Sequence, residues 1–234
     1  MKDCFYIDNH ILVVAKNHNV SLKDFTESVK KELEKENLKA SYLEPIFPIC
    51  SEASGIVVFA LSSKAKERLS KQIEQKLFSA KYLAVCVGKP KYKNNIFYVD
   101  ETDESVEDVK AQYVHMNTKT GKLEYIPRLN EDAIQIFDQY TTLEENQGIS
   151  LVMIDGGLSH ADEIRFVMSD AGSPVFGDKI YAGDTLAKDT NLALSLVELK
   201  FVHPTLNKNL MFRYYLDADK KPWSYLDVKK YIRI

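Results

Sequence analysis

Glycine and proline are both scarce in this sequence, with 9 and 7 among 234 residues, while hydrophobic residues make up 45%. Collagen-like and low-complexity chains need glycine or proline enrichment, and disordered chains are poor in apolar residues, so these classes are excluded. Long apolar runs are also missing, since none approaches the ~18–20 residues that span a membrane. The composition therefore predicts a globular chain with no membrane partner.

Cysteine is scarce as well, with three widely spaced residues at Cys4, Cys50 and Cys86 and no C-x-x-C motif. An odd number of distant cysteines predicts neither a disulfide framework nor a zinc site. The five histidines are scattered and none pairs with another at metal-ligand spacing, so we expect no metal. The first residues hold an early acid, Asp3, and no apolar signal-peptide core, which together with the cysteines predicts a cytoplasmic protein.

Motifs for common cofactors and hydrolytic centres are absent. The chain has no P-loop, no G-x-G-x-x-G, no H-E-x-x-H and no G-x-S-x-G, so nucleotide binding, zinc proteolysis and α/β-hydrolase chemistry have no support. Basic residues number 31 and acidic residues 34, which gives a net charge of −3. That balance gives no general attraction to nucleic acid, so such binding needs a local basic patch. We expect no cofactor.

What the sequence does contain is a series of short apolar segments with the periodicities of strands and helices. Strands are predicted at 11–15, 56–61, 82–87, 110–116, 122–126, 134–143 and 149–154, with a later hairpin of 192–202 and 210–216. Helices are predicted from the capping Ser21 to Leu33, from Ser62 or Ser63 to Leu77, near 161–171, and over 223–232.

Strands outnumber helices and often follow one another directly. This favours an α+β fold in which helices flank a mixed, mostly antiparallel sheet. No repeat or clear linker divides the chain, so we predict a single domain over 1–234. Residues 89–108 are first basic and then acidic, and they form either a lobe boundary or one long surface loop.

The turn-rich loop 45–55 is the first candidate for a site, because it leads straight into a predicted buried strand and loops on rigid sheets commonly carry function. Taken alone, its residues have an ordinary explanation. Cys50 is more often a small buried apolar residue than a nucleophile. Further along, Arg165 has Asp162 and Glu163 nearby as surface partners.

Five segments, in order, resemble motifs of the RluA family of RNA pseudouridine synthases. They match the family's opening strand, its signature His-Arg-Leu-Asp-Arg-(Asp/Glu)-Thr-Ser-Gly, its Lys-x-Tyr-Leu-Ala element, its Gln-Ile-Arg…Gly-Asp…Tyr-Gly stretch and its Leu-x-Phe-x-His-Pro turn. The segments are Ile7–Lys16, Phe47–Gly55, Lys81–Ala84, Ile164–Gly183 and Leu199–Pro204. Their ordered co-occurrence is much more specific than any one of them.

The resemblance implies isomerisation of uridine to pseudouridine in ribosomal or transfer RNA, without a cofactor. We also expect a monomer with no separate S4-type RNA-binding domain. Tyr82 is similar to the tyrosine that stacks on the target base, and Arg165 to the arginine that pairs with the catalytic carboxylate. Substrate recognition is expected from 89–108 and 117–130. The lysines predicted to contact RNA phosphates are Lys16, Lys81, Lys89, Lys91 and Lys93.

The signature itself departs from the family. Cys50 occupies the aspartate position, Pro48 and Ser51 replace the two arginines, and Phe47 replaces the histidine. A carboxyl group with a pKa of ~3.9 is ionised at neutral pH, whereas a thiol near ~8.5 is mostly protonated unless a cation lowers its pKa. We therefore predict impaired or lost activity, with Cys50 as a thiolate or Glu52 as the substitute carboxylate.

The segment before Arg165 departs as well, since His160–Glu163 reads His-Ala-Asp-Glu where the family has Arg-Thr-His-Gln. Together with the net charge, these changes leave two alternatives open beside a divergent synthase. One is an inactive RNA-binding pseudoenzyme, and the other is a cytosolic interaction protein with no RNA role.

Overall fold

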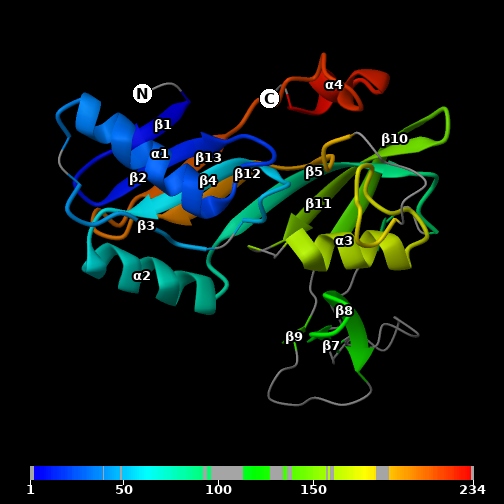
Figure 1. Cartoon of the computed structure of the whole chain (residues 1–234), viewed down its shortest axis with the longest axis horizontal. Helices are drawn as coiled ribbons and strands as arrows, with labels where there is room; N and C mark the ends of the chain where they lie inside the picture. The colour runs from blue at the N-terminus through cyan, green and yellow to red at the C-terminus, as the bar shows by residue number, and fades with distance from the viewer. Residues whose placement is uncertain are drawn as a thin grey trace. The chain divides into compact units, whose positions relative to one another are not determined.

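Figure 1 shows the computed structural model of the chain. It describes residues 3–38, 40–47, 49–91, 94–95, 113–126, 134–135, 139–156, 158, 161–182 and 190–232. Contacts group the chain into two compact units. Unit 1 comprises Met1–Tyr82 and Leu194–Leu216, and unit 2 comprises Leu83–Ala193 and Asp217–Ile234. Most of the predicted excursion 89–108 lies outside the described residues, and a single domain over 1–234 stays a prediction.

Unit 1 is a sheet with two helices. Its strands follow the order β1-β2-β4-β12, with β3 paired to β4 and β13 paired to β12. The β12–β4 pairing is parallel, while β1–β2, β2–β4, β3–β4 and β12–β13 are antiparallel. The elements are β1 (Cys4–Ile7), β2 (Ile11–Lys16), α1 (Leu22–Lys35), β3 (Glu44–Pro45), β4 (Ser54–Ala60), α2 (Ser63–Glu74), β12 (Leu194–Val202) and β13 (Asn209–Arg213).

Strand β4 is the centre of the unit 1 core. Every residue of its sequence Ser-Gly-Ile-Val-Val-Phe-Ala is buried, which is typical of a strand covered on both faces. Phe25 of α1 lies with its ring centroid 6.0 Å from that of Phe59 in β4. Helix α2 also contacts β4 and buries Ala65 and Leu69. The continuous apolar run in the sequence therefore marks the strand on which the candidate loop is mounted.

Serine caps begin both helices of unit 1, as the sequence predicts. The hydroxyl oxygens of Ser21 and Ser62 each accept the backbone N–H three residues further on. Helix α2 ends at Glu74, earlier than predicted, because Lys76 adopts a left-handed backbone with φ 55°. Leu77 is consequently 53% exposed, so its predicted place on the buried helix face is wrong.

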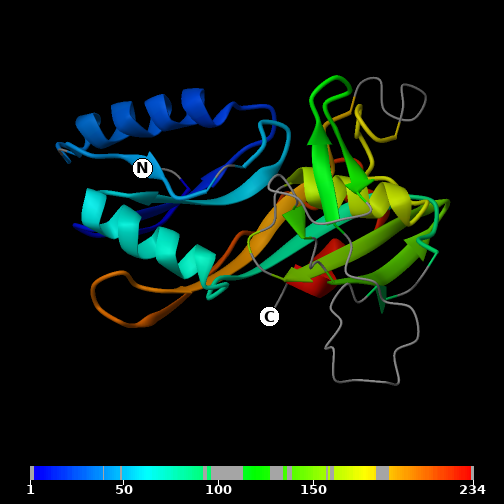
Figure 2. The same ribbon diagram turned by 90° about the horizontal axis from the view of Figure 1, so that it is seen from below.

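Unit 2 contains a second set of strands and α3. Its larger sheet follows the order β5-β11-β10-β6, its smaller sheet follows β8-β7-β9, and β8 contacts α3 (Figure 2). Strand β5 (Ser79–Val87) begins in unit 1 and continues into unit 2. The other elements are β6 (Asn94–Asn95), β7 (Tyr113–Asn117), β8 (Lys122–Ile126), β9 (Ile134–Gln135), β10 (Gln139–Asn146), β11 (Ile149–Gly156), α3 (Ala161–Asp170) and α4 (Val228–Ile232).

The α+β class with a mixed, mostly antiparallel sheet is confirmed. The predicted C-terminal helix is only partly correct: a 3-10 turn at Trp223–Tyr225 precedes the short α4, because Leu226 between them is extended, with φ −133° and ψ 155°. Strand β1 was not predicted from the sequence. Within the described residues, no helix is long and apolar enough to cross a membrane.

Candidate functional site

The loop that carries Cys50 is anchored to β4 at both of its ends. At its start, the Ile46 N–H donates to the Val58 carbonyl at 3.0 Å, and the preceding Pro45 carbonyl accepts from Lys66 of α2. At its end, the chain enters β4 at Ser54. Pro48 lies outside the described residues, and Cys50 is half-buried.

The Ser-Gly pair that ends the signature has a structural explanation. Ser54 and Gly55 lie beside Ser195 and Leu196 in the parallel β4–β12 pairing, and the Ser54 hydroxyl donates to the Ser195 hydroxyl at 3.0 Å. Gly55 has φ 127°, and an added Cβ would overlap the Leu196 backbone. Glycine is therefore required where the loop joins the sheet.

Lys16, at the end of β2, holds the Cys50 loop in place through hydrogen bonds to the loop backbone. Its ammonium donates to the carbonyls of Asn17 at 3.0 Å, Ser51 at 3.0 Å and Ala53 at 2.7 Å. The side chain is fully buried, and this burial lowers the pKa of Lys16 to about 8, against the opposing influence of the neighbouring Cys50. The predicted phosphate contact does not fit this burial, because the ammonium is occupied inside unit 1.

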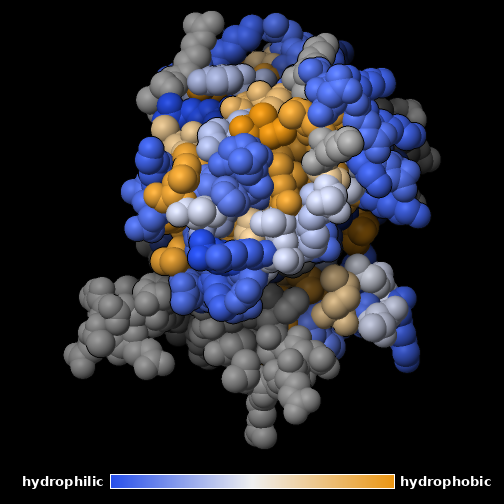
Figure 3. Space-filling view, turned by 90° about the vertical axis from the view of Figure 1, so that its left-hand side faces the viewer, coloured by the Kyte–Doolittle hydropathy of each residue, from blue (hydrophilic) through white to orange (hydrophobic). Residues whose placement is uncertain are grey.

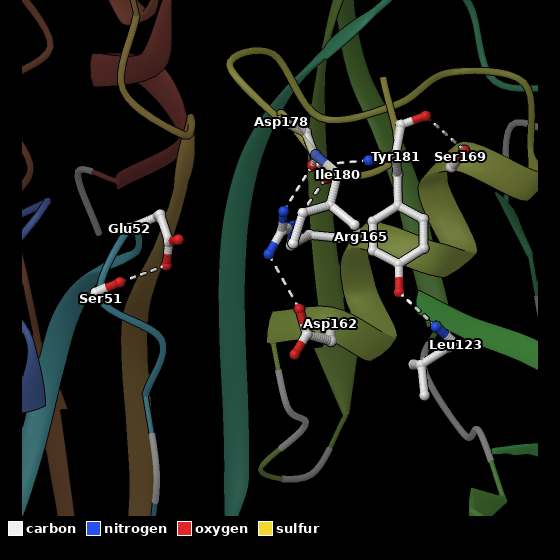
Figure 4. A network of polar contacts seen from close by, with 9 residues as sticks. All are labelled: Ser51, Glu52, Leu123, Asp162, Arg165, Ser169, Asp178, Ile180 and Tyr181. Carbon is white, nitrogen blue, oxygen red and sulfur yellow. Dashed lines mark hydrogen bonds and ion pairs between the residues drawn. The ribbon is translucent and has the colours of Figure 1, made fainter. Parts of the chain in front are cut away.

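The residues after Lys16 continue this support. The Val20 N–H donates to the Ser51 carbonyl at 3.2 Å, and Nδ1 of His18 lies 3.1 Å from the Glu52 carbonyl oxygen. The Ser51 hydroxyl donates to Oε2 of Glu52 at 2.7 Å (Figure 4). Backbone carbonyls at the three consecutive positions 51–53 are thus held by Lys16 at the end of β2 and by the residues that follow it. The role of Glu52 as a substitute carboxylate stays a prediction.

Tyr82 and the remaining lysines that are predicted to bind RNA differ in their burial. Tyr82 is the last residue of unit 1 and is only 4% exposed, and Lys81 is half-buried. The Lys89 side chain is exposed, and so is Lys91, while Lys93 lies outside the described residues. Base stacking and phosphate binding by these residues stay predictions.

The two exposed lysines already have protein partners. Lys89 lies 3.1 Å from Oε1 of Glu145, and the Lys91 ammonium lies 3.5 Å from the Asp170 carbonyl oxygen. Ion pairs at the surface contribute little stability, so a phosphate group can compete for such cations.

Arg165 forms the centre of a buried charge network in unit 2 (Figure 4). Its Nε and Nη2 donate to the two carboxylate oxygens of Asp178 at 2.8 and 2.7 Å. Its Nη1 donates to Oδ1 of Asp162 at 3.0 Å. The Arg165 and Asp178 side chains are 4% and 0% exposed, whereas that of Asp162 is 37% exposed. The sequence suggested that Arg165 pairs with Asp162 or Glu163 at the surface. The contact with Asp162 is present, but Arg165 is buried and its main partner is Asp178, which the sequence did not suggest.

The turn after Gly177 explains how Asp178 reaches Arg165. Oδ1 of Asp178 also accepts the backbone N–H groups of Ile180 at 2.8 Å and Tyr181 at 3.0 Å. The Tyr181 ring centroid lies 5.5 Å from the Arg165 guanidinium carbon. Gly177 has φ 83°, and a Cβ there would overlap the Asn191 backbone carbonyl. The Gly-Asp pair of the late motif is the sequence signal that marks this partner.

The His-Pro turn has a structural role within unit 1. Nε2 of His203 lies 2.8 Å from Oδ2 of Asp8, and Nδ1 accepts the N–H groups of Thr205 at 3.1 Å and Leu206 at 2.9 Å. An acceptor Nδ1 requires the hydrogen of the neutral ring to be on Nε2, so this hydrogen is donated to Asp8. The histidine therefore joins the β12–β13 turn to the turn after β1.

The Asp8 carboxylate accepts four hydrogen bonds in this arrangement. Partial burial raises the pKa of Asp8, but the N–H groups of Ile11 at 2.9 Å and His10 at 2.7 Å, with His203 and Tyr6, outweigh this and lower it. The ionised form of Asp8 is therefore favoured by folding.

A surface hollow of about 390 Å³ lies elsewhere in unit 1 and is lined in part by Ile7, Leu33 and Leu38. Figure 3 shows apolar side chains in orange grouped among hydrophilic ones on this unit. Neither Cys50 nor Tyr82 lines the hollow, so it is separate from the predicted chemistry. Among the described residues, no group of three or more His, Cys, Asp or Glu is placed to hold a metal ion.

Comparisons with solved structures identify proteins of similar fold. The chain superposes on human RNA pseudouridylate synthase domain containing 1 with a TM-score of 0.70 and 17% identity, covering 92% of this chain and 83% of that one. Human RNA pseudouridylate synthase domain containing 4 gives a TM-score of 0.68 and 17% identity, covering 92% and 89%. At these identities the likeness concerns the fold alone.

Sequence comparisons also find relatives that match most of the chain. The chain is 24% identical over 216 residues to the dual-specificity RNA pseudouridine synthase RluA of Haemophilus influenzae, covering 90% of this chain and 91% of the relative. It is 23% identical over 219 residues to an uncharacterized RNA pseudouridine synthase of Mycoplasma pneumoniae, covering 92% and 67%. A model of the family described as RNA pseudouridylate synthase matches residues 10–160, more than half of the chain. Since this match contains the Cys50 loop and its supporting strands, the chain belongs to the RNA pseudouridylate synthase family.

Proposed function

We propose that this protein isomerises uridine to pseudouridine in structured RNA, either ribosomal or transfer RNA, and that it does so slowly. The observation that carries the proposal is the family match over residues 10–160. The names of the relatives, which include dual-specificity RNA pseudouridine synthases, support RNA as the substrate class. The protein acts as a cytoplasmic monomer in this proposal.

The low rate follows from the chemistry at position 50. Isomerisation breaks the glycosidic bond between N1 and C1′ of uridine and joins C5 to C1′, so positive charge develops on the sugar as the first bond breaks. A carboxylate stabilises such charge, as it does in glycoside cleavage. Cys50 offers a thiol with an ordinary pKa of ~8.5, which is mostly uncharged at neutral pH. The loop that carries position 50 is thus formed, but it does not present the carboxylate of the family signature.

The test is a pseudouridine assay with Cys50→Asp and Cys50→Asn as a matched pair. Both substitutions introduce a side chain of the same size, and only aspartate brings the charge. Each purified protein is incubated with mixed ribosomal and transfer RNA, and pseudouridine is quantified by mass spectrometry of nucleosides. We expect slow turnover by the unmodified protein, a gain of about tenfold or more with Cys50→Asp, and no gain with Cys50→Asn. Absence of product from both the unmodified protein and Cys50→Asp rejects the proposal.

A second candidate, an RNA-binding protein without isomerase activity, is favoured by the replacement of the signature aspartate by Cys50. It predicts RNA binding that weakens as salt increases, with no product from the unmodified protein. Absence of both binding and product favours an interaction protein with no RNA role. Binding measured by fluorescence anisotropy at two salt concentrations separates these outcomes.

A further inference from the structure

Helix α2 is the more basic of the two helices in unit 1. It holds four basic and two acidic side chains, whereas α1 holds four of each. Three of its basic residues, Lys64, Arg68 and Lys71, recur at intervals of four and three residues, so they lie along one stripe of the helix. All three are exposed. At ~1.5 Å per residue, the stripe is about 10 Å long.

The two acids of α2 neutralise only part of this stripe. The Lys71 ammonium donates to Oε1 of Glu67 at 2.7 Å, and these side chains are 61% and 64% exposed. Glu67, and to a smaller extent Glu74, raise the pKa of Lys71. Lys64 has no ion-pair partner among the residues that the structure describes. Since an exposed ion pair contributes little stability, the stripe keeps a positive charge that an anion can bind.

The turn between β12 and β13 lies beside α2 and belongs to the same unit (Figure 2). Nη1 of Arg68 donates to the Pro204 carbonyl at 2.7 Å. Gln72 exchanges two hydrogen bonds with the Val202 backbone, at 2.9 and 3.1 Å. These contacts hold the turn against the helix. From Leu199 to Leu216 the sequence contains no acidic residue, so the turn adds no negative charge to the stripe.

Lys208 is the exposed cation of this turn. Its backbone carbonyl accepts the His203 N–H at 2.8 Å, which fixes its position across the turn from His203. All residues from 205 to 209 are exposed. Asp8 contacts the turn, but its carboxylate accepts from His203 at 2.8 Å. Within the described part of the chain, no acid forms an ion pair with Lys208. The turn therefore extends the positive charge of the stripe.

We propose that Lys64, Arg68, Lys71 and Lys208, which we call the α2 surface, bind the phosphate backbone of the RNA substrate. This inference rests on the proposed function and adds a place where the RNA is held. A chain with a net charge of −3 needs such a local patch to bind nucleic acid. RNA is favoured over an acidic protein as the partner, because the chain belongs to the RNA pseudouridylate synthase family.

The experiment measures the binding of fluorescently labelled transfer RNA by anisotropy at several salt concentrations. Phosphate contacts do not read sequence, so transfer RNA is a suitable probe whichever RNA is modified. The test variant combines Lys64→Gln with Lys208→Gln. The control combines Lys30→Gln with Lys31→Gln, which removes the same charge from exposed positions of α1. A third protein with Lys64→Arg and Lys208→Arg keeps both charges. Thermal unfolding checks that each variant is folded.

We expect the test variant to bind transfer RNA about tenfold or more weakly at ~0.1 M salt. The slope of log K against log salt should become shallower by about 1.5, because each lost phosphate contact contributes about 0.7–0.9 to it. The control and the arginine variant should stay within about threefold of the unmodified protein, because they leave the charge of the α2 surface unchanged.

Equal affinities of the test variant and the unmodified protein overturn the inference. An equal loss in the test variant and the control also overturns it, because such a loss reports only net charge. Tighter binding of polyglutamate than of transfer RNA, through the same two lysines, assigns the surface to an acidic protein instead.

The pseudouridine assay separates these failures from failure of the proposed function. If the unmodified protein forms pseudouridine while the test variant binds RNA equally well, only the inference fails. If the unmodified protein neither binds transfer RNA nor forms pseudouridine in mixed ribosomal and transfer RNA, the proposed function fails and the inference fails with it.

Discussion

Replacing Lys16 by methionine tests how the Cys50 loop is held. Methionine has a similar length but no hydrogen-bond donor. In this variant the Ser51 carbonyl still accepts the Val20 N–H, and the carbonyl of the exposed Asn17 can accept a hydrogen bond from water. The carbonyl of the buried Ala53, in contrast, loses the donor at 2.7 Å. Leaving one buried acceptor unsatisfied costs about 1–3 kcal/mol.

A second effect opposes this loss. Burial lowers the pKa of Lys16 from 10.5 to about 8, so at pH 7 the folded state carries an ammonium that is better solvated in the unfolded chain. A shift of this size is worth up to about 3 kcal/mol. Methionine removes that cost together with the hydrogen bonds. At pH 7 the two effects nearly cancel, and we expect Lys16→Met to change the free energy of unfolding by about 1 kcal/mol or less.

The balance changes at alkaline pH. Above pH 8 the folded protein releases the Lys16 proton, whereas the unfolded chain keeps it until pH 10.5. The unfolded state then binds more protons, so the stability of the unmodified protein rises with pH through this window. Lys16→Met lacks this gain. The difference in stability should therefore widen by up to about 3 kcal/mol between pH 7 and pH 10.

Urea unfolding followed by far-ultraviolet circular dichroism at pH 7 and pH 10 measures this difference. Lys64→Met, at an exposed position in α2, is the control for loss of a lysine charge. Titration of the groups other than Lys16 and Lys64 is common to all three proteins and cancels in the comparison. Parallel changes in the unmodified protein and Lys16→Met between the two pH values would refute the reasoning, because they would mean that Lys16 does not titrate differently on folding.

The remaining predictions concern single contacts. Gly55→Ala should lower stability by about 2 kcal/mol or more in urea unfolding, because its Cβ overlaps the Leu196 backbone at φ 127°. Asp178→Asn should cost about 3–5 kcal/mol in the same assay, because it leaves Arg165 buried without its main counter-charge. The lowered pKa of Asp8 means that its stabilising effect is complete above its usual 3.8 and is lost as the pH falls below it. The amount by which Asp8→Asn is less stable than the unmodified protein should therefore be larger at pH 6 than at pH 2, whereas a constant difference would contradict this assignment.

Local patterns were sufficient to predict most elements of the fold. The caps at Ser21 and Ser62 and the apolar run of β4 depend on neighbours within a few residues, so they are readable in the sequence. The end of α2 was placed too late, because the apolar spacing continues to Leu77 while the left-handed Lys76 turns the chain away. Periodicity records which residues suit a helix, but not where the chain must turn.

The sequence by itself was enough to predict the family and the order of its motifs, because both are a matter of residue identity along the chain. Tertiary structure alone decided what the charged groups do. Lys16 is buried beneath loop carbonyls 35 and 37 residues away, and Arg165 is paired with an aspartate 13 residues away. Hydrogen bonds and desolvation depend on distances in space, so the same lysine or arginine can be a surface charge or a buried support until the chain has folded.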